Sequence, residues 1–337
     1  MTKGKATIYD VAGAAHVSLA TVSRAINNPE KVKPETRERV LRVIEELGYK
    51  PNAFAKGLAS RKSTTVAVLV PDMSRASIAE MMNGIADIAR VYKYSILLYI
   101  LDNDESNEEE VLKEIIAAQV DGMLYLNDEI TDKQYEFLLK IKNEYQIPIV
   151  LSNTIYHERE DIPSVSIDYE QAGYEITKKM VAEGRQNIYM VSTVRKYMVN
   201  DLKEKGYLRA MKEANLAPQI MRTSGRISVN TEHFNEYFES HKVDGVVAVR
   251  DSIAVSFINV ARSNHVKIPE DISVCGFQNT KYSRLARPNL TCVDVPIYDI
   301  GAVSMRVLTK AMNQEEIEER TIMLEHGILS RGSTLKS

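Results

Sequence analysis

The residues with the clearest chemical equipment lie near the start of the chain, in the stretch TIYDVAGAAHVSLATVSRAINN. Ser18 is placed to cap a helix over residues 19–27, because its hydroxyl accepts hydrogen bonds from first-turn N–H groups. Val22 and Ile26 lie four residues apart and predict the buried face of that helix. The residues expected on its outward face are Leu19, Ala20, Thr21, Ser23 and Arg24. Arginine suits guanine, hydroxyls suit either base and small apolar groups suit the thymine methyl, so this helix is equipped to enter a DNA major groove.

Two further helices are expected to position this one. Thr7 can cap a helix over residues 10–16, and Pro34 and Gly48 can open and end a third helix over residues 35–47. Their expected inward positions are Val11, Ala14, Ala15, Val40, Ile44 and Leu47. Three helices are enough to bury a helix-turn-helix, whereas the alternative interpretation is a pair of solvated helices.

The distribution of charge favours the DNA-binding interpretation. Residues 1–62 contain 12 Lys+Arg and 6 Asp+Glu, a net charge of +6, whereas residues 63–337 contain 31 and 40, a net charge of −9. A basic segment on a mildly acidic chain predicts phosphate contacts at one end only. The length of 337 residues allows two or three domains.

Several protein classes are disfavoured by the same sequence. The start, MTKGKATIYD, has no apolar signal region, and no apolar run is long enough for a membrane span, so a cytoplasmic protein with no membrane partner is expected. Cys275 and Cys292 are expected to be free and buried. The six histidines show no ligand spacing, so no metal site is expected.

The segment over residues 49–65 is rich in Ala, Ser and Lys. Asn52 can cap a short helix over residues 53–60, and Gly57 weakens such a helix by about 1 kcal/mol relative to Ala. The favoured interpretation is a hinge helix that forms only on DNA and inserts Leu58 into the minor groove. The alternative is a flexible linker.

Beyond this segment, short β-branched runs alternate with amphipathic helices in two series, which predicts an α/β core of two doubly wound parallel-sheet lobes. Ligands bind such folds at the carboxyl ends of the strands. The polar residues expected there include Asp72, Ser74, Asn127, Arg250, Asp251 and Gln278. The expected lobes are residues 65–162 with 293–322 and residues 163–292 with 323–337, the strand and helix of the return segment completing the first lobe. No G-x-G-x-x-G, P-loop or G-x-S-x-G motif supports an enzyme.

Several motifs, in fixed order, resemble the LacI/GalR family of bacterial repressors over essentially the whole chain: YDVA…VSLATVSRAIN, PNAFAKGLASRKSTTVAVLVPD, SIDYEQAG, GYLRAM and RPNLTCVDVPIYDIGAVSMRVL. The resemblance implies a helix-turn-helix headpiece over residues 1–50, a hinge over residues 51–64 and a core like that of periplasmic sugar-binding proteins. It also implies a homodimer that reads a pseudo-palindromic operator in double-stranded DNA. The implied DNA-binding residues are Thr7, Tyr9, Ser18, Leu19, Ala20, Thr21, Ser23, Arg24, Asn28, Asn52, Ala55 and Leu58.

The closest resemblance is to the branch of the family that mediates carbon catabolite control. That branch takes the phosphocarrier protein HPr, phosphorylated on a serine, as corepressor. The implied docking residues are Asp87, Tyr298, Asp299, Arg306 and Lys310. Arg306 can pair bidentately with a phosphate, and Lys310 can add a point charge. The alternative for these two cations is a solvated helix face.

Three positions depart from the family pattern. Gln278 replaces the usual sugar-binding Asp, Lys203 replaces an Arg, and Gly327 follows His326 where this branch has an Arg. The sugar-binding set is therefore incomplete, and one phosphate contact to HPr is missing. The alternative function is a repressor that responds directly to a small sugar or phosphosugar, held through Lys203 and Arg250. No other cofactor is expected.

Overall fold

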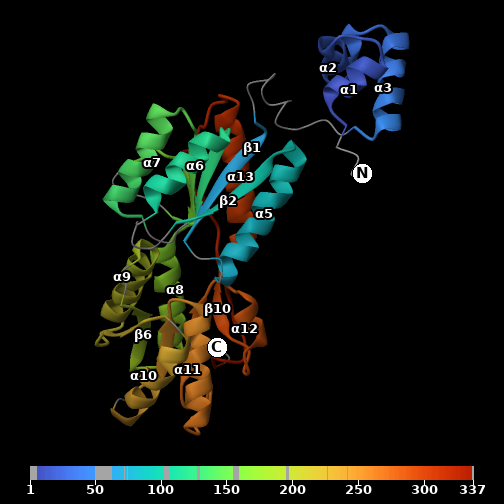
Figure 1. Ribbon diagram of the computed structural model, residues 1–337. Helices are drawn as coiled ribbons and strands as arrows, with labels where there is room; N and C mark the ends of the chain where they lie inside the picture. The colour runs from blue at the N-terminus through green and yellow to red at the C-terminus, as the bar shows by residue number, and fades with distance from the viewer. Residues whose placement is uncertain are drawn as a thin grey trace. The chain divides into compact units, whose positions relative to one another are not determined.

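The computed structural model describes residues 6–49, 63–71, 73, 75–101, 107–126, 130–154, 159–194, 197–225, 227–240 and 242–335 (Figure 1). The chain divides into two compact units, Met1–Ser63 and Thr64–Ser337. Within the described residues, no helix is both long and apolar enough to cross a membrane.

The first unit, here called the headpiece, is a small helical bundle. Its elements are α1 (Ile8–Ala14), α2 (Leu19–Asn27), the 3-10 helix η1 (Pro29–Lys31) and α3 (Pro34–Leu47). The helices pack around Val11, Val22 and Val40, each fully buried. Two expected inward residues, Ala14 and Leu47, are exposed instead. The first helix begins two residues earlier than expected and ends at Ala14, and its buried residues are Val11 and Ala12, followed by Ala15, so Ala12 rather than Ala14 faces the core.

The second unit, here called the core, contains two lobes, each built on one sheet. The first sheet has the order β11-β5-β4-β3-β1-β2 and is parallel throughout the described pairings. Its strands are β1 (Thr65–Val70), β2 (Ser95–Ile100), β3 (Gly122–Leu126), β4 (Ile149–Ser152), β5 (Ser164–Ile167) and β11 (Thr321–Leu324). Its helices are α5 (Ala76–Tyr92), α6 (Glu108–Ala118), α7 (Asp132–Glu144) and α13 (Ile297–Met312).

Strand periodicity divides the first lobe into two hydrophobic layers. Val66, Val68 and Val70 of β1 point toward the layer of α5 and α13, whereas Ala67 and Leu69 point toward α6 and α7. Both faces of the sheet are therefore covered, as Figure 1 shows for the green helices on one side and α5 and α13 on the other. Because helices cover both faces of the sheet, residues on both sides of each strand are apolar, which explains the near-continuous apolar runs in the sequence.

The second sheet has the order β12-β10-β9-β8-β6-β7. Its strands are β6 (Ile188–Thr193), β7 (Gln219–Thr223), β8 (Gly245–Ala248), β9 (Ser273–Phe277), β10 (Thr291–Asp294) and β12 (Gly327–Leu329). Its helices are α8 (Tyr169–Ala182), α9 (Met198–Glu213), α10 (Ile227–Ser240), α11 (Asp251–Ser263) and α12 (Lys281–Leu285). The edge strand β12 runs antiparallel to β10, so this lobe is not wholly parallel.

The expected lobe boundaries need three corrections. Strand β5 pairs with β4 and lies in the first sheet, so the first crossing falls at Asp168 rather than after residue 162. Strand β10 pairs with β9 and lies in the second sheet, so the return segment completes the first lobe with its helix α13 alone. The first sheet also keeps β11 to Leu324, two residues beyond the expected end at residue 322. Backbone pairing with distant segments decides which sheet each of these strands joins, and an apolar run in the sequence does not reveal that partner.

Candidate nucleic-acid interface and lobe cleft

The N-terminal half of α2 carries the candidate base-reading face. Ser18 precedes the helix, and its Oγ accepts a hydrogen bond from the backbone N–H of Thr21 over 3.2 Å. The hydroxyls of Ser18 and Thr21 are 2.9 Å apart, so each has a partner within the headpiece. Leu19, Ala20 and Arg24 are exposed, whereas Thr21 and Ser23 are half-buried. The expected outward face is therefore accessible at Leu19, Ala20 and Arg24, and the half-buried hydroxyls of Thr21 and Ser23 lie at its edge.

A second cap organises α1. Thr7 Oγ1 donates to Asp10 Oδ2 over 2.7 Å, and the backbone N–H of Asp10 points back to Thr7, which forms a capping box. The bonds that Asp10 Oδ2 accepts from the Thr7 hydroxyl and from the Thr7 backbone N–H, each over 2.7 Å, lower the pKa of Asp10. Tyr9 is 71% exposed, and Asn28, at the end of α2, is also exposed. Tyr9 and Asn28 are therefore accessible, whereas the Thr7 side chain is engaged in capping.

Six of the expected site residues lie outside the described residues: Asn52, Ala55, Leu58, Asp72, Ser74 and Asn127.

Asp251, buried at the start of α11 in the second lobe, is the described carboxylic acid whose pKa is raised most. Its Oδ2 accepts hydrogen bonds from the backbone N–H of Thr280 over 2.6 Å and from Thr280 Oγ1 over 2.9 Å. Burial raises the pKa of Asp251 to about 7, against the lowering effect of the Thr280 bonds and of Arg331 and Lys203. A Cβ at Gly276 would lie 2.7 Å from Asp251 Oδ1, so this neighbouring strand position admits no side chain.

Lys203 contacts the protein interior. Its ammonium lies 4.7 Å from the ring centroid of Tyr169 and 4.9 Å from that of Phe277. It also donates to the carbonyl of Val249 over 3.1 Å and to Asn200 Oδ1 over 3.4 Å. Only 1% of Lys203 is exposed. The sequence analysis expected Lys203 to hold an anionic ligand, but its ammonium is buried against protein groups.

Two arginines flank one tyrosine where the lobes meet: Arg250, which the sequence analysis named as a ligand cation, and Arg75, which it did not name as a site residue. Tyr197, at the start of α9 in the second lobe, has Arg250 over its ring at 5.0 Å and Arg75 of the first lobe at 5.4 Å. Arg75 also donates to the Tyr197 hydroxyl over 3.4 Å. The available signal was the position of Arg75 between β1, which ends at Val70, and α5, which begins at Ala76. Gln278 is buried and has a φ of 92°.

The surface where α5 crosses α13 holds the residues expected to dock a protein partner; we call it the α5–α13 surface. Tyr298 donates to Asp87 Oδ2 over 2.8 Å, and Arg90 donates to Asp87 Oδ1 over 2.9 Å. The bond to Asp87 raises the pKa of Tyr298. Its remaining residues, Asp299, Arg306 and Lys310, are exposed. Arg90 belongs to the α5–α13 surface as well, although the sequence analysis did not name it.

The chain is similar over nearly its whole length to known regulators. It is 40% identical over 333 residues to catabolite control protein A of Priestia megaterium, covering 97% of this chain and 99% of the relative. Residues 7–52 match the family described as bacterial regulatory proteins, lacI family.

The chain belongs to the LacI family.

Other comparisons agree with this assignment to the LacI family. Residues 177–334 match the periplasmic binding protein-like domain. The crystal structure of the transcription regulator CcpA of Lactococcus lactis superposes with a TM-score of 0.72 at 32% identity, covering 80% of this chain and 99% of that one. The lac repressor dimer bound to operator and the anti-inducer ONPF superposes with a TM-score of 0.88 at 20% identity, covering 99% and 100%, and shares the fold. This LacI-family chain is a DNA-binding transcriptional regulator of the catabolite control protein A type and not an enzyme.

Proposed function

We propose that this regulator mediates carbon catabolite control by binding a pseudo-palindromic operator as a homodimer. The observation that carries the proposal is the exposed N-terminal half of α2, with Leu19, Ala20 and Arg24 at the surface of a segment that bears a net charge of +6 over residues 1–62. Thr21 and Ser23 lie at the edge of the same face and complete the proposed base contacts.

Further headpiece residues are proposed to contact the DNA backbone. Tyr9 and Asn28 are exposed and can donate to phosphate oxygens, and Thr7 and Ser18 stand at helix N-termini, where backbone N–H groups favour anions. Asn52, Ala55 and Leu58 are proposed to belong to a hinge helix, with Leu58 as the minor-groove wedge.

For the homodimer we propose the edge of the first sheet as part of the interface. Strand β2 pairs with β1 on one side only within the described sheet, and its Leu97, Leu98 and Ile100 are 37%, 42% and 50% exposed. Val91 and Tyr92, at the end of the adjoining α5, are also exposed. An uncovered apolar edge favours pairing with another chain, and a second copy supplies the same surface under two-fold symmetry.

Serine-phosphorylated HPr is the proposed corepressor, and the α5–α13 surface is its proposed docking site. Arg306 and Lys310 are exposed one turn apart on α13 and can hold the phosphate. Tyr298 and Arg90 fix the carboxylate of Asp87 in place, so the acidic part of this surface is preorganised for a basic partner.

A second candidate function is direct response to a small sugar or phosphosugar in the cleft. Arg75 and Arg250 favour it, since both guanidinium groups flank Tyr197 at the junction of the lobes. The burial of Lys203 and the neutral amide of Gln278 favour the HPr-dependent function instead.

The decisive experiment is an electrophoretic shift on a pseudo-palindromic operator, with and without purified serine-phosphorylated HPr. HPr should tighten operator binding of the wild type, and affinity should fall by roughly 0.9 log units per neutralised phosphate for each log unit of salt. Arg306→Ala should weaken binding of the phosphorylated partner by about tenfold or more and leave binding without HPr nearly unchanged. Arg262→Ala, an exposed arginine on α11, is the matched control. Tightening by a sugar panel but not by HPr would select the second candidate.

A further inference from the structure

The start of α5 lies between two helices of the second lobe and is bonded to only one of them within the described residues. On one side, Arg75 donates to the hydroxyl of Tyr197 at the start of α9 over 3.4 Å. On the other side, α5 and α12 line a pocket of about 630 Å³ between the lobes. Figure 1 shows α9 and α12 on opposite sides of the second lobe. A rotation of the lobes about the bonded side would therefore narrow or widen this pocket.

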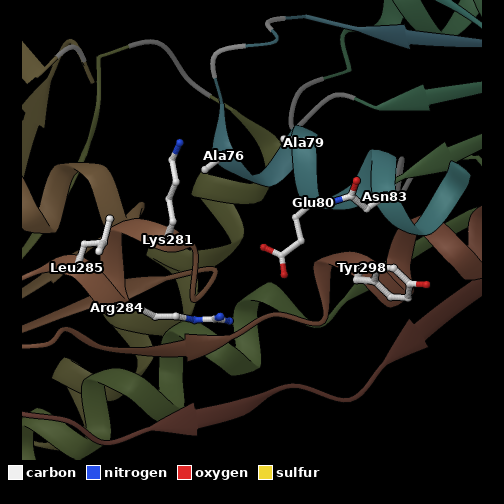
Figure 2. A pocket seen from close by; sticks show the side chains of 8 residues that line it. All are labelled: Ala76, Ala79, Glu80, Asn83, Lys281, Arg284, Leu285 and Tyr298. Atoms are coloured by element: carbon white, nitrogen blue, oxygen red, sulfur yellow. The ribbon is translucent and has the colours of Figure 1, made fainter. Parts of the chain in front are cut away.

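The two walls of the pocket carry opposite charges. Figure 2 shows Glu80 of α5 and Arg284 of α12 extending from opposite walls toward the same space, with Lys281 on the wall of Arg284. Arg284 and Lys281 are exposed, and Glu80 is half-buried. Burial raises the pKa of Glu80, and the charge of Arg284 partly offsets this effect. Within the described residues Glu80 and Arg284 form no salt bridge, so the two charges act on each other across the pocket without forming an ion pair.

Each wall is fixed to its own lobe. In the first lobe α5 packs directly on α13, because a Cβ at Gly84 would lie 2.1 Å from the carbonyl oxygen of Tyr298. In the second lobe Arg331 donates to Ser283 Oγ over 3.1 Å and anchors α12. The distance between the two facing charges therefore changes when the lobes move relative to each other.

Neighbouring acids are engaged within their own lobes. Asp294, whose charge also acts on Glu80, accepts a hydrogen bond from Asn279 over 2.8 Å. Asp87 accepts a hydrogen bond over 2.8 Å from the hydroxyl of Tyr298, which lines the pocket with its ring. Among the residues that line the pocket, Glu80 is the one acid available to pair with the cations of α12.

We propose that Glu80 and Arg284 form a latch between the lobes. When the lobes rotate so that the pocket closes, the two side chains form an ion pair that holds α5 against α12. Glu80 has already lost part of its hydration in the open arrangement, so pairing removes less water from it than from a fully exposed carboxylate. The ion pair favours the closed arrangement because only that arrangement brings the two charges into contact. The latch requires neither DNA nor HPr and goes beyond the proposed function.

The first test is carbodiimide crosslinking of the full-length variant Arg284→Lys, with the linked peptides identified by mass spectrometry. The reagent activates the Glu80 carboxyl, and the amine introduced at position 284 displaces the urea by-product and forms an amide, so only groups that meet are joined. A link between positions 80 and 284 is expected. Arg262→Lys, with the same amine at an exposed position of α11, should give no link from position 262 to Glu80. Lys178 and Glu213, 3.7 Å apart and both accessible, serve as the positive control within the same sample.

A second test asks whether the two charges drive closure. Asn83→Cys/Leu285→Cys places one thiol on each wall of the pocket, and a short bismaleimide reports closure without using the latch residues. The two native cysteines are buried. In this background Glu80→Arg or Arg284→Glu alone should lower the yield of the link, because like charges then face each other. The two substitutions together should restore the yield, since they exchange the charges and keep the attraction.

Two results would overturn the proposal. One is the absence of the link between positions 80 and 284 in a sample where Lys178 and Glu213 are joined, or its formation only between chains when isotopically labelled and unlabelled protein are mixed. The other is an equal bismaleimide yield in the reporter protein, the single variants and the charge exchange. Because no operator or HPr is present, failure here leaves the proposed function untouched, and failure of the operator experiment leaves the latch standing.

Discussion

At the scale of single residues, Asp251 is a carboxylic acid whose chemistry the fold changes strongly. The sequence indicated a polar residue at a strand end, and the structure adds that burial outweighs the two Thr280 bonds and raises its pKa to about 7 from 3.8. The folded chain therefore binds the Asp251 proton more tightly than the unfolded chain does. The free energy of unfolding then falls as pH rises from about 4 to about 7 and is level above that range, for this group.

We expect Asp251→Asn to remove this contribution. Between pH 4 and pH 7 the variant should lose less unfolding free energy than the wild type, by as much as about 4 kcal/mol, because each unit of pKa shift corresponds to about 1.4 kcal/mol. Urea denaturation followed by circular dichroism at several pH values measures it. Asp299→Asn, an exposed carboxylate on α13, should keep the wild-type slope. Identical slopes in all three proteins would contradict the role given to Asp251.

Sequence reasoning identified residue types at this scale better than their surroundings. It placed Lys203 and Arg250 together as ligand cations, but the aromatic rings of Tyr169 and Phe277, distant in sequence, enclose the lysine. It placed Arg75 in a strand-end segment but not among the site residues, because only the folded chain brings this residue to Tyr197 of the other lobe. Such contacts depend on packing between segments that periodicity treats separately.

At the scale of elements, the ends of the headpiece helices were predictable from local chemistry. Ser18 caps α2 as expected, and Gly48 ends α3 with a φ of 60°, a left-handed conformation that glycine adopts without steric cost. Local signals suffice here because capping involves only the nearest few residues. The burial of Ala14 was predicted wrongly, because Ala12 and not Ala14 lies with Val11 and Ala15 in the headpiece core.

Gly48→Ala should destabilise the headpiece by about 1 kcal/mol, because alanine pays the steric cost of a positive φ although no atom lies within 4 Å of the added methyl. Gly13 lies within α1, where the added methyl also meets nothing, so Gly13→Ala should stabilise the headpiece by up to about 1 kcal/mol. Hydrogen exchange of headpiece amides in the full-length protein measures both changes. Equal effects of the two substitutions would rule out backbone conformation as the cause.

The crossing of α5 and α13 is the second feature at this scale. A Cβ on Gly84 would lie 2.1 Å from the carbonyl oxygen of Tyr298, and one on Gly301 would lie 2.2 Å from that of Met81. Gly301→Ala should therefore separate the helices and cost at least about 1–3 kcal/mol. Gly327→Ala, where the methyl has open space, serves as the control. Urea denaturation that gives the same midpoint for both would disprove this tight crossing.

At the scale of the whole molecule, the α/β core with two doubly wound lobes was predicted from alternating strands and helices, but the membership of individual strands was not. Strand β10 was assigned to the first lobe with α13, which follows it, yet it pairs with β9 in the second sheet. Every strand of such a core is apolar, so composition cannot identify its neighbours. The chain therefore crosses between the lobes three times, near Asp168, Val295 and Glu325.

The exposed edge strand β2 gives a prediction about assembly. Leu98→Lys/Ile100→Lys places two charges on the proposed dimer surface and should weaken self-association at least tenfold, as like charges meet across the symmetry axis. Analytical ultracentrifugation measures the shift from dimer toward monomer. Val229→Lys, at an exposed position of α10 in the second lobe, should leave the sedimentation profile unchanged. A dimer unaffected by both charges would place the interface elsewhere.

The last crossing joins β11 to β12, and these two short strands form the outer edges of different sheets. A frameshift or stop codon shortly before Thr321 would therefore strip both lobes of a border strand, leaving β5 and β10 with unpaired backbone groups. Bacteria carrying such a lesion should accumulate aggregated polypeptide rather than a regulator that lacks only a dispensable tail.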